Sequence, residues 1–190
     1  MHELQHQRDI LRIFRGNYSN MAIEHAGVDS INKAMTNTAT LVIDAIPDTH
    51  PCIITSSQIV ETLPQWTTKK MTREFTHIVQ KTIADLERGI PNGGLTVSIN
   101  KLQINMRSHN NTQLSKSAAL VLASILEYVA THILEASAAI AHGSRRINAT
   151  HVRNALSKNT PWKKNISLRG VEALTSMFFL TPQKRAASAA

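Results

Sequence analysis

A long helix that is apolar on nearly all sides is the feature that most constrains this chain of 190 residues. Residues 117–142 place Leu, Val, Ile and Ala on almost every helical face, so the helix must be buried on more than one side. Shorter helices are expected on either side of it, at residues 98–106 and 150–157. A short–long–short set of helices cannot cover its own central helix, and it therefore needs a partner of similar size.

The first half of the chain supplies such a partner. Apolar periodicity and turn signals predict helices at residues 2–14, 20–46 and 56–63, and one more at residues 67–88. The uncharged, turn-rich residues 89–94 are interpreted as a linker. The repeat predicts an all-α fold in which two tandem units clasp each other within one chain. The expected parts are residues 1–88, the linker 89–94, residues 95–158 and a C-terminal extension over residues 159–190.

Charge is divided unevenly between the two halves. Residues 1–90 contain 9 Lys and Arg against 10 Asp and Glu, whereas residues 91–190 contain 12 against 3. The basic half suggests a polyanionic partner, with nucleic acid first, although charge alone fits a solvated basic surface equally well. The single cysteine, Cys52, excludes an intrachain disulfide framework and a Cys-rich zinc site. No apolar run approaches the roughly 20 residues that span a bilayer, so no membrane partner is expected.

Several segments resemble core histones. The stretch 119–129 followed by Ile133-Leu134-Glu135 resembles the central helix of histone 2A, and Arg145-Arg146-Ile147 with Thr150-His151-Val152 resembles its second loop and third helix. Residues 54–59, followed by Pro64 and a long helix, resemble histone 2B with its added C-terminal helix. The order is similar to the fused histone doublets of giant DNA viruses, here in a trimmed, nearly tailless variant.

This resemblance implies two tandem histone folds that form an intrachain pseudo-heterodimer. It implies a structural DNA-packaging protein that wraps double-stranded DNA in nucleosome-like particles with a partner resembling histones 4 and 3, itself possibly a fused doublet. Contacts to phosphates and to the minor groove would be independent of sequence. The implied location is the virion and the viral factory or host nucleus, in association with DNA. No cofactor, metal or small-molecule substrate is implied.

Candidate DNA contacts are of two kinds. The starts of the two long helices can point backbone N–H groups at phosphates, and basic side chains can reach the backbone or the minor groove. Arg146 matches the family's minor-groove arginine, for which a solvated loop residue is the alternative. The expected DNA-binding residues are Arg12, Arg15, Ser19, Asn20, Lys101, Arg107, Lys116, Arg145, Arg146 and Thr150.

Two further surfaces follow from the resemblance. Glu74, Glu127 and Glu135 match positions of the histone acidic patch, which is reduced because His132 replaces one of its acidic residues. The C-terminal extension loosely resembles the histone 2A docking segment. Its expected contacts with the partner histones are Gly170, Val171, Phe178, Phe179 and Leu180.

The sequence offers little support for a metal site, a nucleotide site or catalysis. A metal site at His132, His142 and His151 is disfavoured, because His132 and His142 lie about 80° apart around their helix. Cys52 has no base nearby in sequence, residues 92–94 lack the Lys of a P-loop, and no catalytic triad is visible, so an enzyme is not expected. Trp66 and Trp162 are interpreted as packing anchors rather than base-stacking platforms. The alternative function is a histone-fold interaction subunit of a transcription or kinetochore complex.

Overall fold

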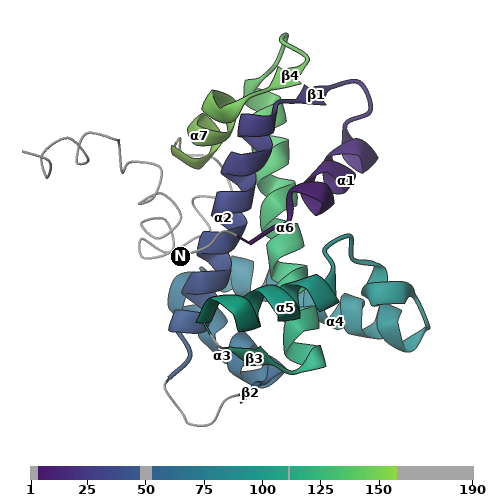
Figure 1. Cartoon of the computed structure of the whole chain (residues 1–190), viewed down its shortest axis with the longest axis vertical. Coiled ribbons are helices and arrows are strands. Elements are labelled where there is room, and N and C mark those ends of the chain that lie inside the picture. The colour runs from purple at the N-terminus through teal and green to yellow at the C-terminus, as the bar shows by residue number, and fades with distance from the viewer. Residues whose placement is uncertain (1–3, 48–52, 111, 158–190) are drawn as a thin grey trace, which may run out of the picture.

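The long apolar helix α6 (Lys116–Ile140) runs through the centre of the protein (Figure 1). The structure is a computed structural model, and it describes residues 4–47, 53–110 and 112–157. Every residue from Ala118 to Leu126 is buried, because helices from both halves of the chain pack around α6. An 18-residue window of α6 is apolar enough to cross a membrane, but 72% of that window is buried inside the protein. The prediction of a helix buried on more than one side is confirmed.

The described residues are mostly helical, and the strands among them are two residues long, so the predicted all-α class is confirmed. In the first half, α1 (Gln7–Asn17) and β1 (Ala22–Ile23) precede the long helix α2 (His25–Asp44), which is the partner of α6, and four elements follow it. These four elements are β2 (Ile53–Ile54), α3 (Ser56–Trp66), α4 (Lys69–Glu87) and the 3-10 turn η1 (Pro91–Gly94). The second half contains α5 (Ile99–Asn110), β3 (Gln113–Leu114), α6, β4 (Arg146–Ile147) and α7 (Ala149–Ser157).

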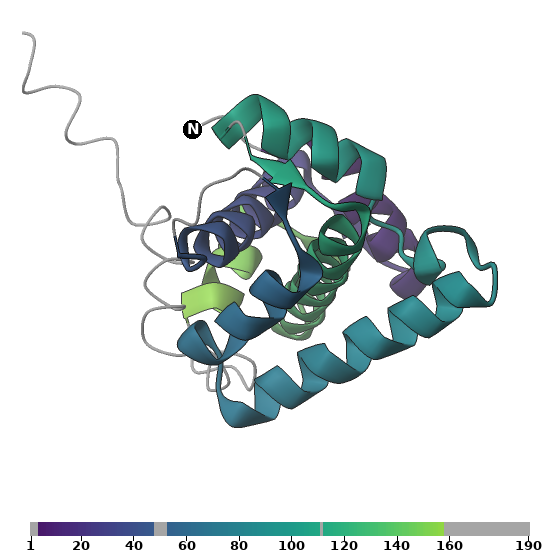
Figure 2. The same ribbon diagram turned by 90° about the horizontal axis from the view of Figure 1, so that it is seen from below.

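The two halves are joined crosswise by two short parallel strand pairs. β1, which precedes the long helix of the first half, pairs with β4, which follows the long helix of the second half. β2 and β3 form the reciprocal pair at the other end. Each half also packs its last short helix on the long helix of the other, α3 on α6 and α7 on α2, while α2 contacts α6 (Figures 1 and 2). Neither half therefore buries its long helix by itself.

Side-chain caps fix several helix starts. The Thr55 hydroxyl and the Gln58 side chain form a capping box at the start of α3, and the Ser115 hydroxyl accepts the Ala118 N–H (3.1 Å) at the start of α6. The prediction that α3 would end before Pro64 is wrong. The helix continues to Trp66, where both the N–H and the hydroxyl of Thr67 donate to the Leu63 carbonyl (3.0 and 2.6 Å).

The predicted start of the first helix, at residue 2, is also wrong. Residues 4–6 precede α1 and are tied to α2, because the Leu4 N–H donates to the Thr36 hydroxyl (3.1 Å) and the His6 N–H donates to the Asn32 amide oxygen (3.0 Å). The polar side chains of Asn32 and Thr36 lie on the buried face of α2. These two side chains bind the backbone of residues 4–6 to α2, and helix α1 begins only at Gln7.

The expected linker folds as a tight turn against α4. Gly93 has φ +61°, and a Cβ atom at this position would lie 2.5 Å from the Thr82 carbonyl oxygen of α4. Asn92 shares the left-handed conformation with φ +55°. The turn thus needs glycine at residue 93 both for its conformation and for its close approach to α4.

Some predictions concern residues outside the described ranges. These are the C-terminal extension with Gly170, Val171, Phe178, Phe179 and Leu180, together with Trp162 and Cys52.

Candidate nucleic-acid interface

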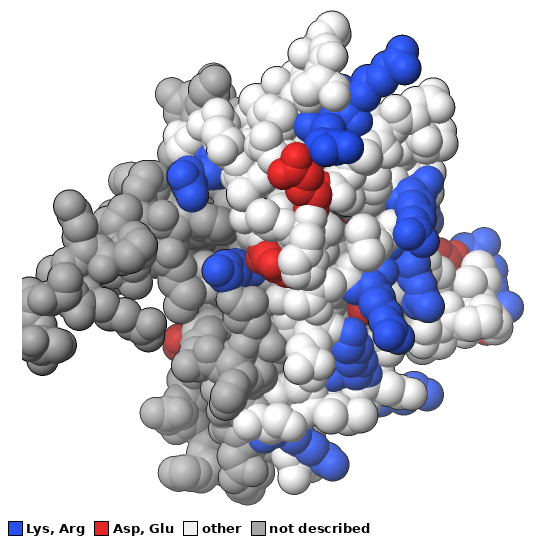
Figure 3. Space-filling view, turned by 45° about the horizontal axis from the view of Figure 1, so that its top comes forward, with Lys and Arg blue, Asp and Glu red and all other residues white. Residues whose placement is uncertain are grey.

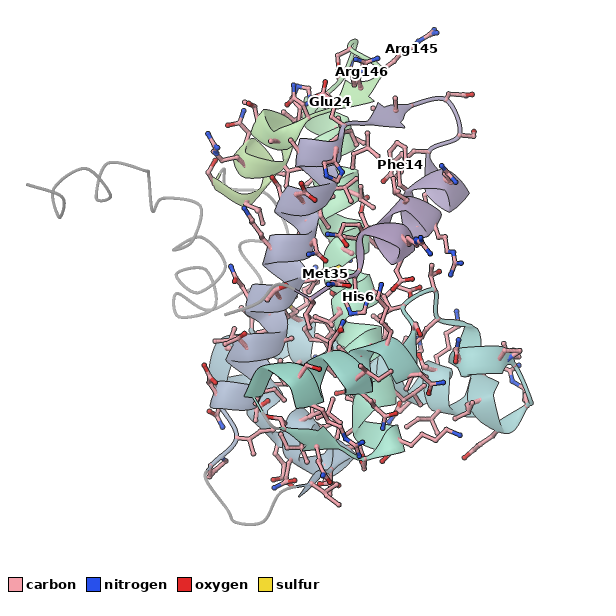
Figure 4. All side chains as sticks on the ribbon, viewed as in Figure 1. His6, Phe14, Glu24, Met35, Arg145 and Arg146 are labelled. Atoms are coloured by element: carbon pink, nitrogen blue, oxygen red, sulfur yellow. The ribbon has the colours of Figure 1, made fainter. Side chains whose placement is uncertain are left out.

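Arg145 and Arg146 lie at the end of the protein where β1 and β4 pair. α6 ends at Ile140, Gly143 turns the chain with φ +96°, and Arg145 itself has φ +50°. The Ser144 hydroxyl braces this loop, since it donates to the Arg146 carbonyl (2.9 Å) and accepts the Arg146 N–H (3.3 Å). Both arginines are exposed, and Figure 4 shows Arg145 pointing away from the body of the protein. The loop is therefore fixed in backbone while its guanidinium groups remain accessible.

The first half of the chain contributes the neighbouring groups. The Ala22 N–H donates to the Arg145 carbonyl (2.9 Å), and the Glu24 N–H donates to the Ile147 carbonyl (2.9 Å). The Glu24 carboxylate lies 4.0 Å from Nη1 of Arg146. Thr150, also a predicted contact, is exposed in the first turn of α7. The helix begins at Ala149, one residue earlier than predicted. The Asn148 amide oxygen caps its start by accepting the His151 N–H (3.0 Å).

Ser19 and Asn20 do not begin the long helix of the first half. They are exposed in the turn between α1 and β1, and α2 starts only at His25, with Glu24 as its N-cap residue. The predicted role of these two residues as a phosphate-binding helix start is wrong. The strand pairing of β1 displaces the helix start, because Ala22 and Ile23 are extended along β4.

A stripe of three arginines runs along the exposed face of α1. Arg8, Arg12 and Arg15 are spaced by four and three residues, and all three are exposed. Arg12 and Arg15 are predicted DNA contacts, whereas Arg8 was not predicted. The i, i+4, i+7 spacing is the signal that identifies all three as one helical face.

The remaining predicted basic residues lie on α5 and at the start of α6. Arg107 is exposed, and Lys116 is the exposed first residue of α6, directly after the capping Ser115. Lys101 is half-buried and lies close enough to Asp9 for its charge to help lower the pKa of that carboxyl. Figure 3 shows Lys and Arg side chains gathered along one side of the protein, over α1 and α5. The structure thus brings basic groups of both halves to one face.

A buried polar cluster lies behind this basic face. Asp9 is 4% exposed, and its Oδ2 lies 2.8 Å from Nδ1 of the fully buried His6. Burial alone raises the pKa of Asp9, but the hydrogen bond and charge of His6, the charge of Lys101 and the nearby Ser98 backbone together lower it. Asp9 of the first half therefore lies close to the start of α5 in the second half.

Glu127 binds the backbone directly before α5. One carboxylate oxygen, Oε2, accepts the N–H groups of Thr96 (2.6 Å) and Val97 (2.9 Å). Burial raises the pKa of Glu127 more than these hydrogen bonds lower it. One oxygen of the Glu127 carboxylate thus binds the backbone of residues 96–97, while the place of Glu127 in an acidic patch stays a prediction.

The other two predicted acidic-patch residues lie at the two ends of a short line of contacts between α4 and α6. The Tyr128 hydroxyl donates to Oε2 of Glu74 (2.6 Å). The ring centroids of Tyr128 and His132 lie 4.1 Å apart in an edge-to-face arrangement. Nδ1 of His132 lies 3.2 Å from Oε2 of the exposed Glu135. Burial and the Glu74 carboxylate raise the pKa of Tyr128 well above its usual range. The carboxylates of Glu74 and Glu135 thus already have partners within the protein.

The last two sequence-based interpretations concern Trp66 and a possible metal site. Trp66 is 2% exposed and its ring lies 5.7 Å from that of Phe75, so its interpretation as a packing anchor is confirmed. Within residues 4–47, 53–110 and 112–157, no group of three or more His, Cys, Asp or Glu side chains is placed to hold a metal ion.

Comparison with known proteins identified no relative: no protein-family model matches the chain, and no curated protein matches it either.

Proposed function

We propose that this protein is a histone doublet that packages DNA: two histone folds, similar to histones 2B and 2A, fused in one chain. The crosswise arrangement supports this proposal. Each short–long–short half pairs its first loop with the second loop of the other half, through β1–β4 and β2–β3, and each leaves its long helix to be covered by the other. This is the arrangement in which a fused pair of such folds would act as its own heterodimer.

The observation that carries the DNA-binding proposal is the distribution of exposed basic side chains over both halves on one face. Arg145 and Arg146 lie at the β1–β4 end, Arg8, Arg12 and Arg15 along α1, and Arg107 and Lys116 on α5 and α6. An extended polyanion such as duplex DNA matches a band of charge better than a compact ligand does. The positions favour phosphate contacts, with Arg146 entering the minor groove in the manner of histone arginines.

The proposed particle needs a second histone pair. A partner resembling histones 4 and 3 would complete a nucleosome-like particle, and residues 159–190 would dock on it. We propose that the protein acts in association with DNA in virions and in the viral factory or host nucleus, without catalytic activity, cofactor or small-molecule substrate.

The direct test is reconstitution of the chain with DNA and a histone 4–histone 3 pair, followed by nuclease digestion. A protected ladder of regular length is the expected result. Unprotected DNA, together with a stable protein complex, would refute DNA packaging and favour the alternative, a histone-fold interaction subunit.

Point variants test which surface binds. The triple variant Arg8→Ala, Arg12→Ala, Arg15→Ala and the single variant Arg146→Ala are expected to weaken binding about equally on unrelated duplexes, because their contacts read backbone and groove shape rather than bases. Lys81→Ala, which removes one exposed charge from α4, is the matched control for Arg146→Ala. Equal effects of Lys81→Ala and Arg146→Ala would show that charge acts without a defined interface.

A further inference from the structure

The two junctions at which a strand leads into a long helix differ in one residue that faces the proposed DNA site. At each junction a two-residue strand leads into a long helix through a single N-cap residue, which is Glu24 for α2 and Ser115 for α6. Ser115 caps its helix in the usual way, since its hydroxyl accepts the Ala118 N–H. The Glu24 side chain accepts no N–H group of its own helix. The Glu24 carboxylate therefore contributes no side-chain cap to α2.

The Glu24 carboxylate instead faces Arg146 from the other half of the chain. Its Oε1 lies 4.0 Å from Nη1 of Arg146, and the two side chains are 44% and 66% exposed. The backbone fixes this approach, because the Glu24 N–H donates to the Ile147 carbonyl next to Arg146. Figure 4 shows both side chains at the same end of the protein. The ion pair is therefore set by the fold and remains open to a ligand.

We infer that Glu24 is an intramolecular competitor of DNA: in the free protein its carboxylate takes the place beside Arg146 that a DNA phosphate takes in the complex. This inference rests on the proposed function. A carboxylate and a phosphate oxygen bind the same guanidinium donors, so DNA must break the Glu24–Arg146 pair before it gains Arg146. The start of α2 also favours negative charge, and Glu24 already supplies it there.

The effect is confined to one end of the protein. At the β2–β3 end the corresponding N-cap is the uncharged Ser115, and the next residue is the basic Lys116. At the β1–β4 end Glu24 is followed by His25, whose Nε2 lies 3.4 Å from the Asp29 carboxylate. Glu24 therefore makes the grip on DNA weaker at the β1–β4 end than its two arginines alone would provide.

The test compares Glu24→Gln with Glu87→Gln in the full chain, using a short duplex of random sequence at several salt concentrations. Both variants remove one acidic charge, but Glu87 is the last residue of α4 and lies outside the β1–β4 junction. Glu24→Gln is expected to tighten binding about two- to fivefold, the range that an exposed ion pair can supply. It should also steepen the slope of log affinity against log salt, by less than the roughly 0.9 of a whole phosphate contact, because Arg146 meets a phosphate in both complexes and only the competing carboxylate is lost. Glu87→Gln should change neither by a comparable amount.

A double variant assigns the effect to Arg146. In the Arg146→Ala background, Glu24→Gln should lose most of its gain in affinity, because there is no guanidinium left to release. Glu24→Ser, which copies the Ser115 cap, should tighten binding as Glu24→Gln does and so excludes a peculiarity of glutamine.

Two results would overturn the inference while leaving the proposed function intact. One is a wild-type protein that binds DNA and is weakened by Arg146→Ala, but for which Glu24→Gln and Glu87→Gln are indistinguishable. The other is a gain from Glu24→Gln that persists undiminished without Arg146. A wild-type chain that binds no duplex at all refutes the proposed function itself, and the inference with it.

Discussion

Replacing Asp9 with alanine is expected to destabilise both halves of the protein at once. Asp9 lies on α1 in the first half, yet its pKa is lowered by the Ser98 backbone and the Lys101 charge of the second half, so it lies close to the start of α5. It also lies 2.8 Å from Nδ1 of His6, whose ring is fully buried. One side chain thus connects two segments that are separated by almost ninety residues.

The magnitude follows from the group that Asp9→Ala leaves unpaired. The buried His6 imidazole N–H loses its acceptor, at a cost of about 1–3 kcal/mol. This loss is a large part of the roughly 5–15 kcal/mol that a folded domain usually has. For a protein of this size it corresponds to a fall in melting temperature of about 2–12 °C. Asp9→Asn keeps one acceptor and should lose about half as much.

The pH dependence provides an independent check. Because the fold lowers the pKa of Asp9, its ionised form stabilises the folded state. This contribution is complete above the unfolded pKa of about 3.9 and is lost as the pH falls through the folded pKa. The stability difference between the wild type and Asp9→Asn should therefore shrink below about pH 4.

Thermal and urea unfolding followed by circular dichroism measure these differences, and Arg12→Ala is the control. Arg12 also pairs with Asp9, at 3.9 Å, but its side chain is 70% exposed, so its loss should change stability by well under 1 kcal/mol. If Asp9→Ala melts like Arg12→Ala, or if the variant unfolds in two separate steps with one half unaffected, the reasoning that Asp9 couples the halves is wrong.

Three further predictions concern the core and the turns. Glu127→Ala leaves the N–H groups of Thr96 and Val97 without an acceptor and should cost about 2–4 kcal/mol in urea unfolding, whereas Glu127→Gln should stay within about 1 kcal/mol at neutral pH. Because burial raises the pKa of Glu127, the wild type should gain stability over Glu127→Gln at low pH and lose that gain as the pH rises through the folded pKa. Leu126→Asp places an unpaired carboxylate at a position with 0% exposure and should abolish the helical circular dichroism signal, whereas Leu126→Met should retain it; a folded Leu126→Asp variant would contradict the placement of α6. Gly93→Ala should cost about 1–3 kcal/mol, because its φ is +61° and its Cβ would meet a backbone carbonyl of α4; an unchanged melting temperature would contradict this.

The sequence predicted the elements whose causes are local. The capping Ser115 and the apolar residues after it fix α6 to within two residues, and the Thr55 box fixes the start of α3. Trp66 is buried, in agreement with its interpretation as a packing anchor. The spacing of the three arginines in the sequence already places Arg8 on the same face of α1 as Arg12 and Arg15, so Arg8 could have been predicted as well.

Tertiary structure decided the features that depend on residues far apart in the chain. A strand of two residues has no periodicity of its own, so only its partner β4 shows that Ala22–Ile23 is extended and that α2 begins at His25 instead of residue 20. The same limit applies to charge. Composition counts Asp9, Glu24 and Glu127 alike as acidic residues, but the fold buries Asp9 against His6, turns Glu127 to the backbone of residues 96–97 and sets Glu24 against Arg146. The physical reason is that helix formation and capping are settled within a few residues, whereas desolvation and ion pairing depend on which distant groups the fold brings within a few ångströms.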